Sequence, residues 1–196
     1  MTNSITNAMH AAALSIYTYL VYQGLINDKP HYTIWIFLLF LIILILKLIG
    51  VLVHIPRIEK DRKRHNFFWV IISVLVIVLN IVTLMSINSG WILFAAGMSV
   101  TSVLCVMYVR SLFTGTGSFL WIAAAMAFMH ILCASVTHDM LRVSWICLMA
   151  SSILWIALSR VPFLLRHKFH NDIYHLTLIA STYLLYTTVP TGLWTR

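Results

Sequence analysis

The sequence predicts an all-helical, polytopic membrane protein with seven transmembrane helices, and three observations lead to this fold class. Of the 196 residues, 61% are hydrophobic and only 9% are charged, whereas about a quarter of a soluble domain is charged. The apolar residues form continuous runs of roughly 20 residues, the length that crosses the core of a bilayer. These runs lack the short alternating pattern of a membrane barrel, so helices must satisfy the backbone.

Seven spans follow one another along the chain. The first, about 8–26, is the least hydrophobic, and it is expected to be a retained helix because no basic region or cleavage site of a signal peptide precedes it. The second, about 33–55, is the most apolar. The others are expected at about 67–87, 90–109, 118–136, 143–160 and 172–190. The connections are too short for a second domain, so residues 1–196 are predicted to form one bundle.

Tryptophans and basic residues place the spans in the bilayer. Five tryptophans lie near the start of a span, where an aromatic belt would place them: Trp35, Trp69, Trp91, Trp121 and Trp145. Nine lysines and arginines fall in connections on the side of the N-terminus, and five of them belong to the stretch RIEKDRKRH. Only Lys29, Arg142 and Arg196 fall on the other side. This bias predicts a cytoplasmic N-terminus and an external C-terminus.

Candidate metal ligands gather at one predicted membrane depth. The stretch HKFHNDIYHL, residues 167–176, is crowded with polar side chains just before an apolar run. His170, Asp172 and His175 begin the seventh span, His54 ends the second and His10 begins the first. Because all of these span ends are predicted to be cytoplasmic, we expect the five residues to lie at a similar level.

Helix geometry narrows this set. Asp172 and His175 are three residues apart and Asn171 and His175 four apart, so each pair shares a face. His170 is five residues from His175 and is expected to contribute only from the connection. Zinc needs three or four such ligands, and a zinc-bound water is a hydrolytic nucleophile. The structural alternative is that Asn171 or Asp172 caps the helix behind a basic loop.

These residues resemble a known family. A histidine near the cytoplasmic end of the second helix and an NDIYHL-like start of the seventh are similar to the seven-helix membrane hydrolase superfamily. That superfamily includes the progestin and adipoQ receptors, hemolysin III proteins and alkaline ceramidases. The resemblance implies that His54 and His175 are zinc ligands. The chain departs from the family pattern where Asn171 replaces a histidine, Gly50 replaces a serine, and the third span holds Asn80 but no aspartate.

The leading hypothesis is a membrane-embedded, zinc-dependent hydrolase-like protein that acts on a lipid amide or ester. His54 and His175 would bind zinc with His170 or Asp172, and His10 would be an alternative ligand; no catalytic residue is assigned. The alternative is a non-enzymatic membrane protein, receptor-like, a transporter or an assembly factor, with a structural polar cluster. A transporter would show a continuous polar path joining Lys47, Asn80 and His130.

Further expectations concern Lys47, other cofactors and location. Lys47 lies inside the second span and either faces the bundle interior or extends toward the headgroups. The last span has no lysine, which excludes a retinal Schiff base there. A haem bound between His54 and His175 is a third hypothesis for this site. The expected partners are membrane lipids rather than nucleic acid, and the short connections suggest a bacterial inner membrane.

Overall fold

The computed structural model describes residues 2–117, 119–167 and 169–194, and these residues form helices and connections without a strand. The predicted all-helical fold class is confirmed. In these residues the long helices are α1 (Thr2–Ile26), α2 (Ile34–Val53), α4 (Arg62–Ser86), α5 (Trp91–Phe113), α6 (Leu120–Val136), α7 (Asp139–Leu158) and α9 (Phe169–Thr187). Short helices α3 (Pro56–Glu59), α8 (Pro162–Arg166) and η1 (Val189–Thr191) lie between or after them. Each expected span overlaps one long helix.

Several helices extend beyond the apolar runs that predicted them. Helix α4 begins at Arg62 rather than near 67, because the Asp61 side chain accepts hydrogen bonds from the backbone of Lys63 and Arg64. The stretch RIEKDRKRH, expected as a loop, therefore contributes to α3 and to the first turn of α4. Helix α9 begins at Phe169 rather than 172, which places His170 on the helix. Ser118, the first residue of the expected fifth span, lies outside the described residues.

The long helices differ in how apolar they are. Among the described residues, α2, α4, α5 and α7 are long and apolar enough to cross a membrane, and α6 is a shorter apolar helix of 17 residues. Helices α1 and α9 carry more polar residues, and these side chains bond to one another between the two helices, as described below. An integral membrane protein is thus the class that the helices indicate.

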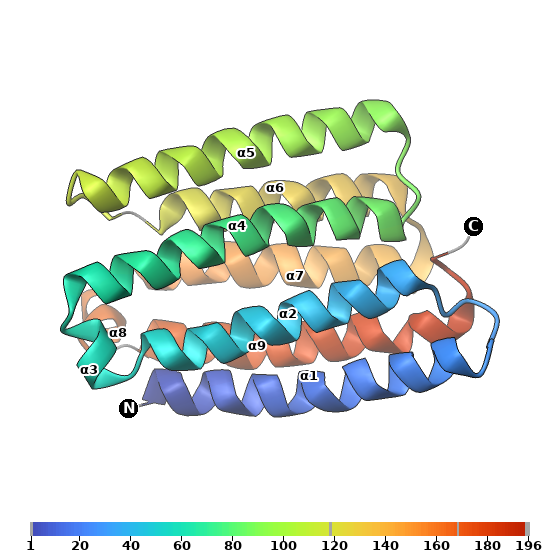
Figure 1. The fold of residues 1–196 in the computed structure, drawn as a ribbon, viewed down its shortest axis with the longest axis horizontal. Coiled ribbons are helices and arrows are strands. Elements are labelled where there is room, and N and C mark those ends of the chain that lie inside the picture. Colours follow the sequence, from blue (N-terminus) through green and yellow to red (C-terminus); the bar gives the residue numbers. More distant parts are fainter. Residues whose placement is uncertain (1, 118, 168, 195–196) are drawn as a thin grey trace.

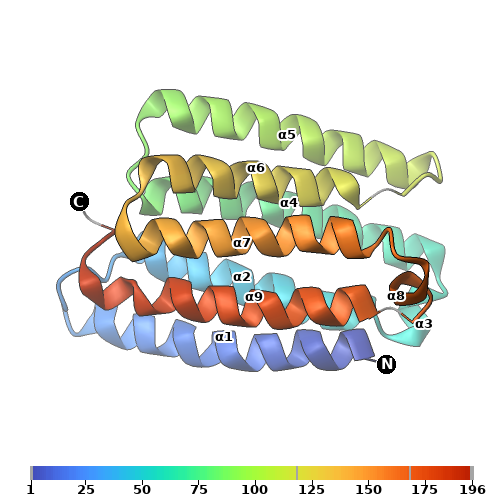
Figure 2. The same ribbon diagram turned by 180° about the vertical axis from the view of Figure 1, so that it is seen from behind.

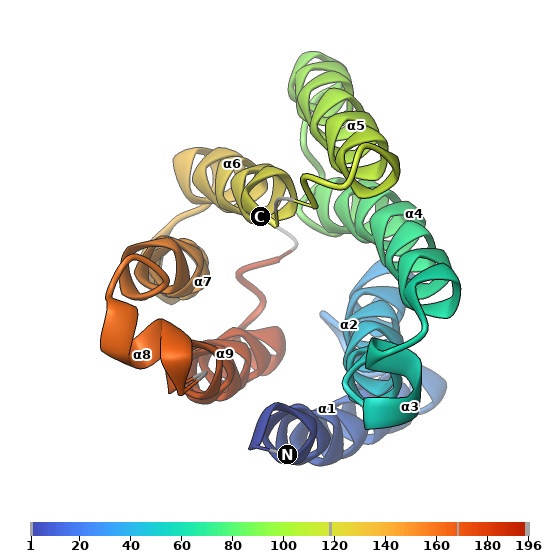
Figure 3. The ribbon, with the colours of Figure 1, turned by 90° about the vertical axis from the view of Figure 1, so that its left-hand side faces the viewer.

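The long helices other than α5 form a closed ring, and α5 packs outside it against α4 and α6 (Figure 3). Each packs against the next along the chain, and α9 packs against α1 to close the ring, while α4 also contacts α6 behind α5. Successive long helices run in opposite directions (Figures 1 and 2). As a result α3, α8 and the N-terminus lie at one end of the bundle, called here the α3/α8 end, and the C-terminus lies at the other.

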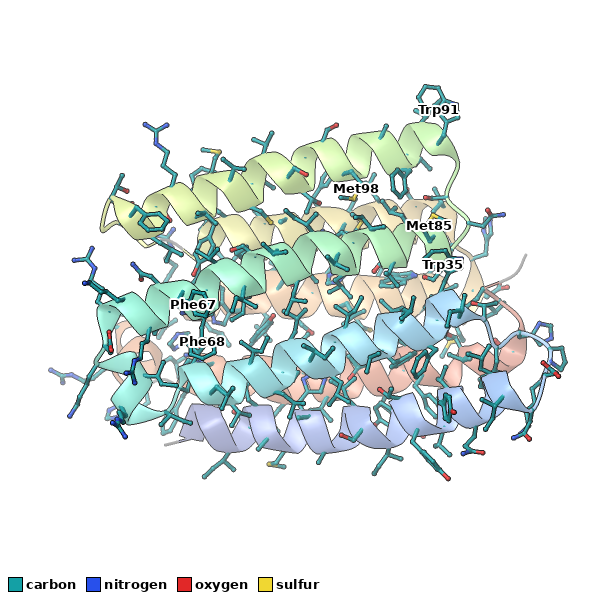
Figure 4. All side chains as sticks on the ribbon, in the orientation of Figure 1. Trp35, Phe67, Phe68, Met85, Trp91 and Met98 are labelled. Carbon is teal, nitrogen blue, oxygen red and sulfur yellow. The ribbon has the colours of Figure 1, made fainter. Side chains whose placement is uncertain are left out.

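The bundle is apolar outside and partly polar inside. Large hydrophobic side chains such as Ile16, Phe67 and Phe113 are more than half exposed, and side chains surround the bundle on its outside (Figure 4). Polar side chains such as Asn80 and Ser144 are fully buried. This distribution is the one expected of a protein whose outer surface contacts lipid and whose polar groups face the bundle interior.

The tryptophans only partly follow the predicted aromatic belt. Trp35 and Trp91 are exposed at the starts of α2 and α5, and Trp91 points away from the bundle (Figure 4). Trp145 is instead buried at the start of α7, where its ring stacks on His130. Trp69 packs against Phe119. The belt prediction is therefore wrong for Trp145, whose ring fills the interior of the bundle.

Candidate functional site

The ring of helices encloses a cavity of about 660 Å³. Its walls are mainly apolar and include Leu39, Leu79, Met126, Met129, Leu148 and Leu178. The exposed residue Arg160, which follows α7, also lines the cavity, so the cavity reaches the surface at the α3/α8 end. Pockets of about 300–1,000 Å³ with apolar walls and a few polar groups are typical binding sites for small molecules.

Four of the five predicted metal ligands line this one cavity. His10 comes from α1, His54 from the end of α2, and His170 and His175 from the first half of α9. Their positions on these helices place them toward the α3/α8 end. Asp172, the fifth candidate, does not line the cavity.

His10 is buried and joins α1 to α9. Its Nε2 lies 3.0 Å from Thr182 Oγ1. Because the Thr182 hydroxyl donates to the backbone oxygen of Leu178 at 2.8 Å, we infer that it accepts from His10 Nε2. His10 Nδ1 is then the ring nitrogen with the lone pair, and it is buried without a hydrogen-bond partner.

His175 also bonds to a partner helix, but its Nε2 accepts the hydrogen bond, whereas His10 Nε2 donates one. Asn7 Nδ2 donates to His175 Nε2 at 3.1 Å, so the ring proton of neutral His175 lies on Nδ1, which is buried without a partner. Gly50 makes room for this bond, since a Cβ at Gly50 would lie 3.1 Å from Asn7 Oδ1. Gly50 thus lets Asn7 approach α2.

The first turn of α9 holds the remaining polar side chains. His170 is buried and its Nδ1 donates to the Leu164 carbonyl oxygen at 3.2 Å. Asn171 lines the cavity and accepts from Trp155 Nε1 at 2.7 Å. Asp172 accepts from Thr6 Oγ1 at 3.2 Å. The structural alternative supposed that Asn171 or Asp172 caps the helix. Neither does, because both lie inside the first turn of α9 and bond to neighbouring helices.

Lys47 points into the cavity rather than toward the headgroups. It lies within α2 and lines the cavity, and its Nζ sits 5.6 Å from the centre of the Tyr174 ring. A cation over an aromatic face is stabilised by the ring quadrupole. A charged side chain in a transmembrane helix costs about 2.5–3.5 kcal/mol on insertion scales, so such residues usually have a function.

The residues present do not fit zinc as they are arranged. Among the described residues, no group of three or more His, Cys, Asp or Glu side chains could hold a metal ion. The hydrogen bond from Asn7 also occupies the lone pair of His175. A metal centre would require His175 to exchange Asn7 for the metal.

The other half of the cavity has a separate polar group. Asn80 and His130 line it, and the Asn80 amide donates to Thr101 Oγ1 at 3.0 Å. Lys47, Asn80 and His130 thus share one cavity, as the transporter hypothesis required of them. The path between them is not continuously polar, since Leu79, Met126 and Met129 also form the wall.

Sequence reasoning missed the polar partners on the first helix. Asn7 and His10 are three residues apart and Thr6 and His10 four apart, so they follow one stripe of α1. This stripe in the least apolar span was the available signal. Tyr174 and Trp155 carried no comparable signal, because aromatic residues are common in helices of any kind.

Comparison with models of protein families, with curated proteins and with solved structures finds no match.

Proposed function

We propose that this protein is a seven-helix integral membrane protein that binds a lipid-like amphipathic molecule in its central cavity. The observation that carries the proposal is the composition of the cavity wall. Lys47, His10, His54, His170 and His175 lie toward the α3/α8 end, and the rest of the wall is mainly apolar, with Asn80 and His130 among its few polar residues. A molecule with a polar head and a hydrocarbon tail matches this division, because each part would meet groups of its own polarity.

The charge distribution supports an orientation with the α3/α8 end in the cytoplasm. Arg57, Arg64, Arg110, Arg160 and Arg166 lie at this end, with further lysines and arginines beside them. The opposite end carries Lys29 and Arg142 among the described residues. In this orientation the seven long helices cross the bilayer, the N-terminus is inside and the C-terminus outside. The short connections favour a bacterial inner membrane as its location.

A cavity-filling substitution tests the binding of a lipid. Ala123 lines the cavity, so Ala123→Trp should fill part of it. Ala96 is exposed on α5, so Ala96→Trp is a matched control on the outer surface. Lipids that remain with the purified protein after detergent exchange would be extracted and identified by mass spectrometry. The proposal expects a single-chain lipid species bound to the wild type and to Ala96→Trp and depleted in Ala123→Trp. Equal lipid content in all three proteins would contradict it.

A zinc-dependent hydrolase that acts on a lipid amide or ester is a second proposal. It is favoured by the presence of His10, His54, His170 and His175 in the lining of one cavity, although His175 would have to release Asn7 to bind the metal. The buried, unpartnered Nδ1 of His10 also has a lone pair available for a ligand. The same amphipathic cavity would then hold the substrate.

Metal content separates the two proposals. Zinc would be measured by mass spectrometry in the purified wild type, His54→Ala and His175→Ala. His138 is a suitable control, because it precedes α7 and does not line the cavity. About one zinc per chain, lost in both variants and kept in His138→Ala, would support the hydrolase. A wild type without zinc after zinc is resupplied would leave the binding protein as the only proposal.

A further inference from the structure

Lys47 places a cationic side chain in the cavity. None of the described residues that line the cavity is aspartate or glutamate. Asp172 is engaged with Thr6 on α1, and Asp61 pairs with Arg64 at the α3/α8 end. The polar neighbours of Lys47 in the cavity include His10, His54 and His175, which are neutral or cationic. The ring of Tyr174 is the contact that stabilises the ammonium group.

The environment of Lys47 therefore attracts an anion. Two unit charges interact more strongly as the surrounding dielectric constant falls, and the apolar walls of the cavity provide such surroundings. An anionic group that enters the cavity passes Arg160 at the surface and then meets Lys47, and none of the described lining residues offers a competing carboxylate. His175 Nδ1 is a further buried donor without a partner in the same region.

The rest of the cavity wall favours a ligand whose anionic group is attached to a hydrocarbon chain. Beyond the level of Lys47 the cavity is lined mainly by apolar side chains such as Leu79, Met126 and Leu148, with Asn80 and His130 among them. We propose that Lys47 binds the anionic headgroup of a single-chain amphiphile, through a carboxylate or phosphate oxygen, with its hydrocarbon chain along these side chains. This inference rests on the proposed function and adds the charge of the ligand.

Tryptophan fluorescence offers a direct test. Trp69, Trp145 and Trp155 line the cavity, so a brominated hydrocarbon chain bound there would quench their emission. Trp35 and Trp91 are exposed, and Trp121 is half-buried and does not line the cavity, so these three would be replaced by phenylalanine to reduce emission from outside the cavity. The probes are 9,10-dibromostearate and the corresponding neutral alcohol, added at pH 8 to the protein in lipid nanodiscs.

Lys47→Met removes the charge and keeps most of the apolar stem, while Lys47→Arg keeps the charge. Lys60→Met is the control, since Lys60 is exposed and does not line the cavity. We expect the acid to bind at least about tenfold more tightly than the alcohol, which corresponds to one favourable charge contact. That preference should disappear in Lys47→Met and persist in Lys47→Arg and Lys60→Met. Competition by oleate and by oleoyl lysophosphatidate then shows whether a carboxylate or a phosphate is preferred.

Two outcomes would overturn the inference in different ways. If the acid and the alcohol quench with equal affinity, or if Lys47→Met keeps the preference for the acid, the cavity binds lipid but Lys47 does not select its charge. If neither probe nor the competing lysophosphatidate binds, the proposed function fails together with the inference.

Discussion

Individual polar residues in this protein connect helices that are otherwise apolar. Asn7 is buried on α1 and bonds to His175 on α9, and Gly50 on α2 leaves the space that Asn7 occupies. A buried polar group without its partner is costly because no water replaces the lost bond. The three residues therefore act together, although they lie on three helices.

Replacing Asn7 should destabilise the protein. Asn7→Ala leaves His175 Nε2 without its donor, and hydrogen bonds between membrane helices contribute about 0.6–2 kcal/mol. A chain of this size loses about 2–4 °C in Tm for each kcal/mol. We expect the Tm in detergent, followed by circular dichroism, to fall by a few degrees. Asn27→Ala removes an exposed bond to the Gln23 carbonyl and is the control. Equal shifts in the two variants would mean that the bond to His175 adds nothing.

The sequence predicted the level of a residue along the bundle axis where that level follows from the order and direction of the helices. His10, His54, His170 and His175 line one cavity because the helices that carry them have ends on the same side, which the order of spans already implied. It could not tell that Asp172 would turn toward Thr6, because that depends on how α9 is rotated against α1. Rotation about a helix axis is determined by packing partners that are distant in the sequence.

Pairs of helices are joined by specific contacts at particular depths. At the α3/α8 end, Trp155 on α7 donates to Asn171 on α9 at 2.7 Å. Deeper in the bundle, Ser151 and Ser181 join the same two helices at 3.2 Å. On the other side of α9, the rings of Tyr17 and Tyr186 stack with centroids 4.9 Å apart and join it to α1. Helix α9 is thus fixed between α7 and α1.

The contact between α7 and α9 predicts coupling between two substitutions. Trp155→Phe and Asn171→Ala each remove the same hydrogen bond, so the double variant should lose less stability than the sum of the single variants. The expected coupling is about 0.6–1.7 kcal/mol, the range for hydrogen bonds between membrane helices. Unfolding free energies in detergent would be measured for the full cycle. As a control, the effects of Trp155→Phe and Asn27→Ala on the unfolding free energy should be additive. If the effects of Trp155→Phe and Asn171→Ala were additive too, the hydrogen bond between Trp155 and Asn171 would have no energetic role.

At the scale of the whole molecule, the bundle has two chemically different ends. Arginines and lysines crowd the α3/α8 end, whereas the exposed Trp35 and Trp91 lie at the other (Figure 4). The order of the long helices and their approximate positions were predictable from the sequence, because each long helix overlaps a run of apolar residues. The weaker apolar character of α1 and α9 was explained only by the structure, where their polar side chains bond to each other at the contact that closes the ring.

The proposed orientation predicts which end is reachable from outside the cell. Lys29 and Lys60 are both exposed but lie at opposite ends of the bundle. A membrane-impermeant maleimide added to intact cells should label Lys29→Cys and should label Lys60→Cys only after the membrane is opened. The wild type gives the background from Cys105, Cys133 and Cys147. Labelling of Lys60→Cys in intact cells would reverse the orientation.

The closure of the ring has a consequence for biosynthesis. His10 bonds to Thr182, which lies 172 residues later in the chain, and Asn7 and Thr6 bond to α9 in the same way. The ribosome therefore releases α1 long before α9 exists. In the proposed orientation, the polar stripe of α1 must be kept from the hydrocarbon during translation, by water or by the insertion machinery, until α9 arrives. Completion of the bundle is thus a late event, and a truncated nascent chain would expose the side chains that later form the cavity.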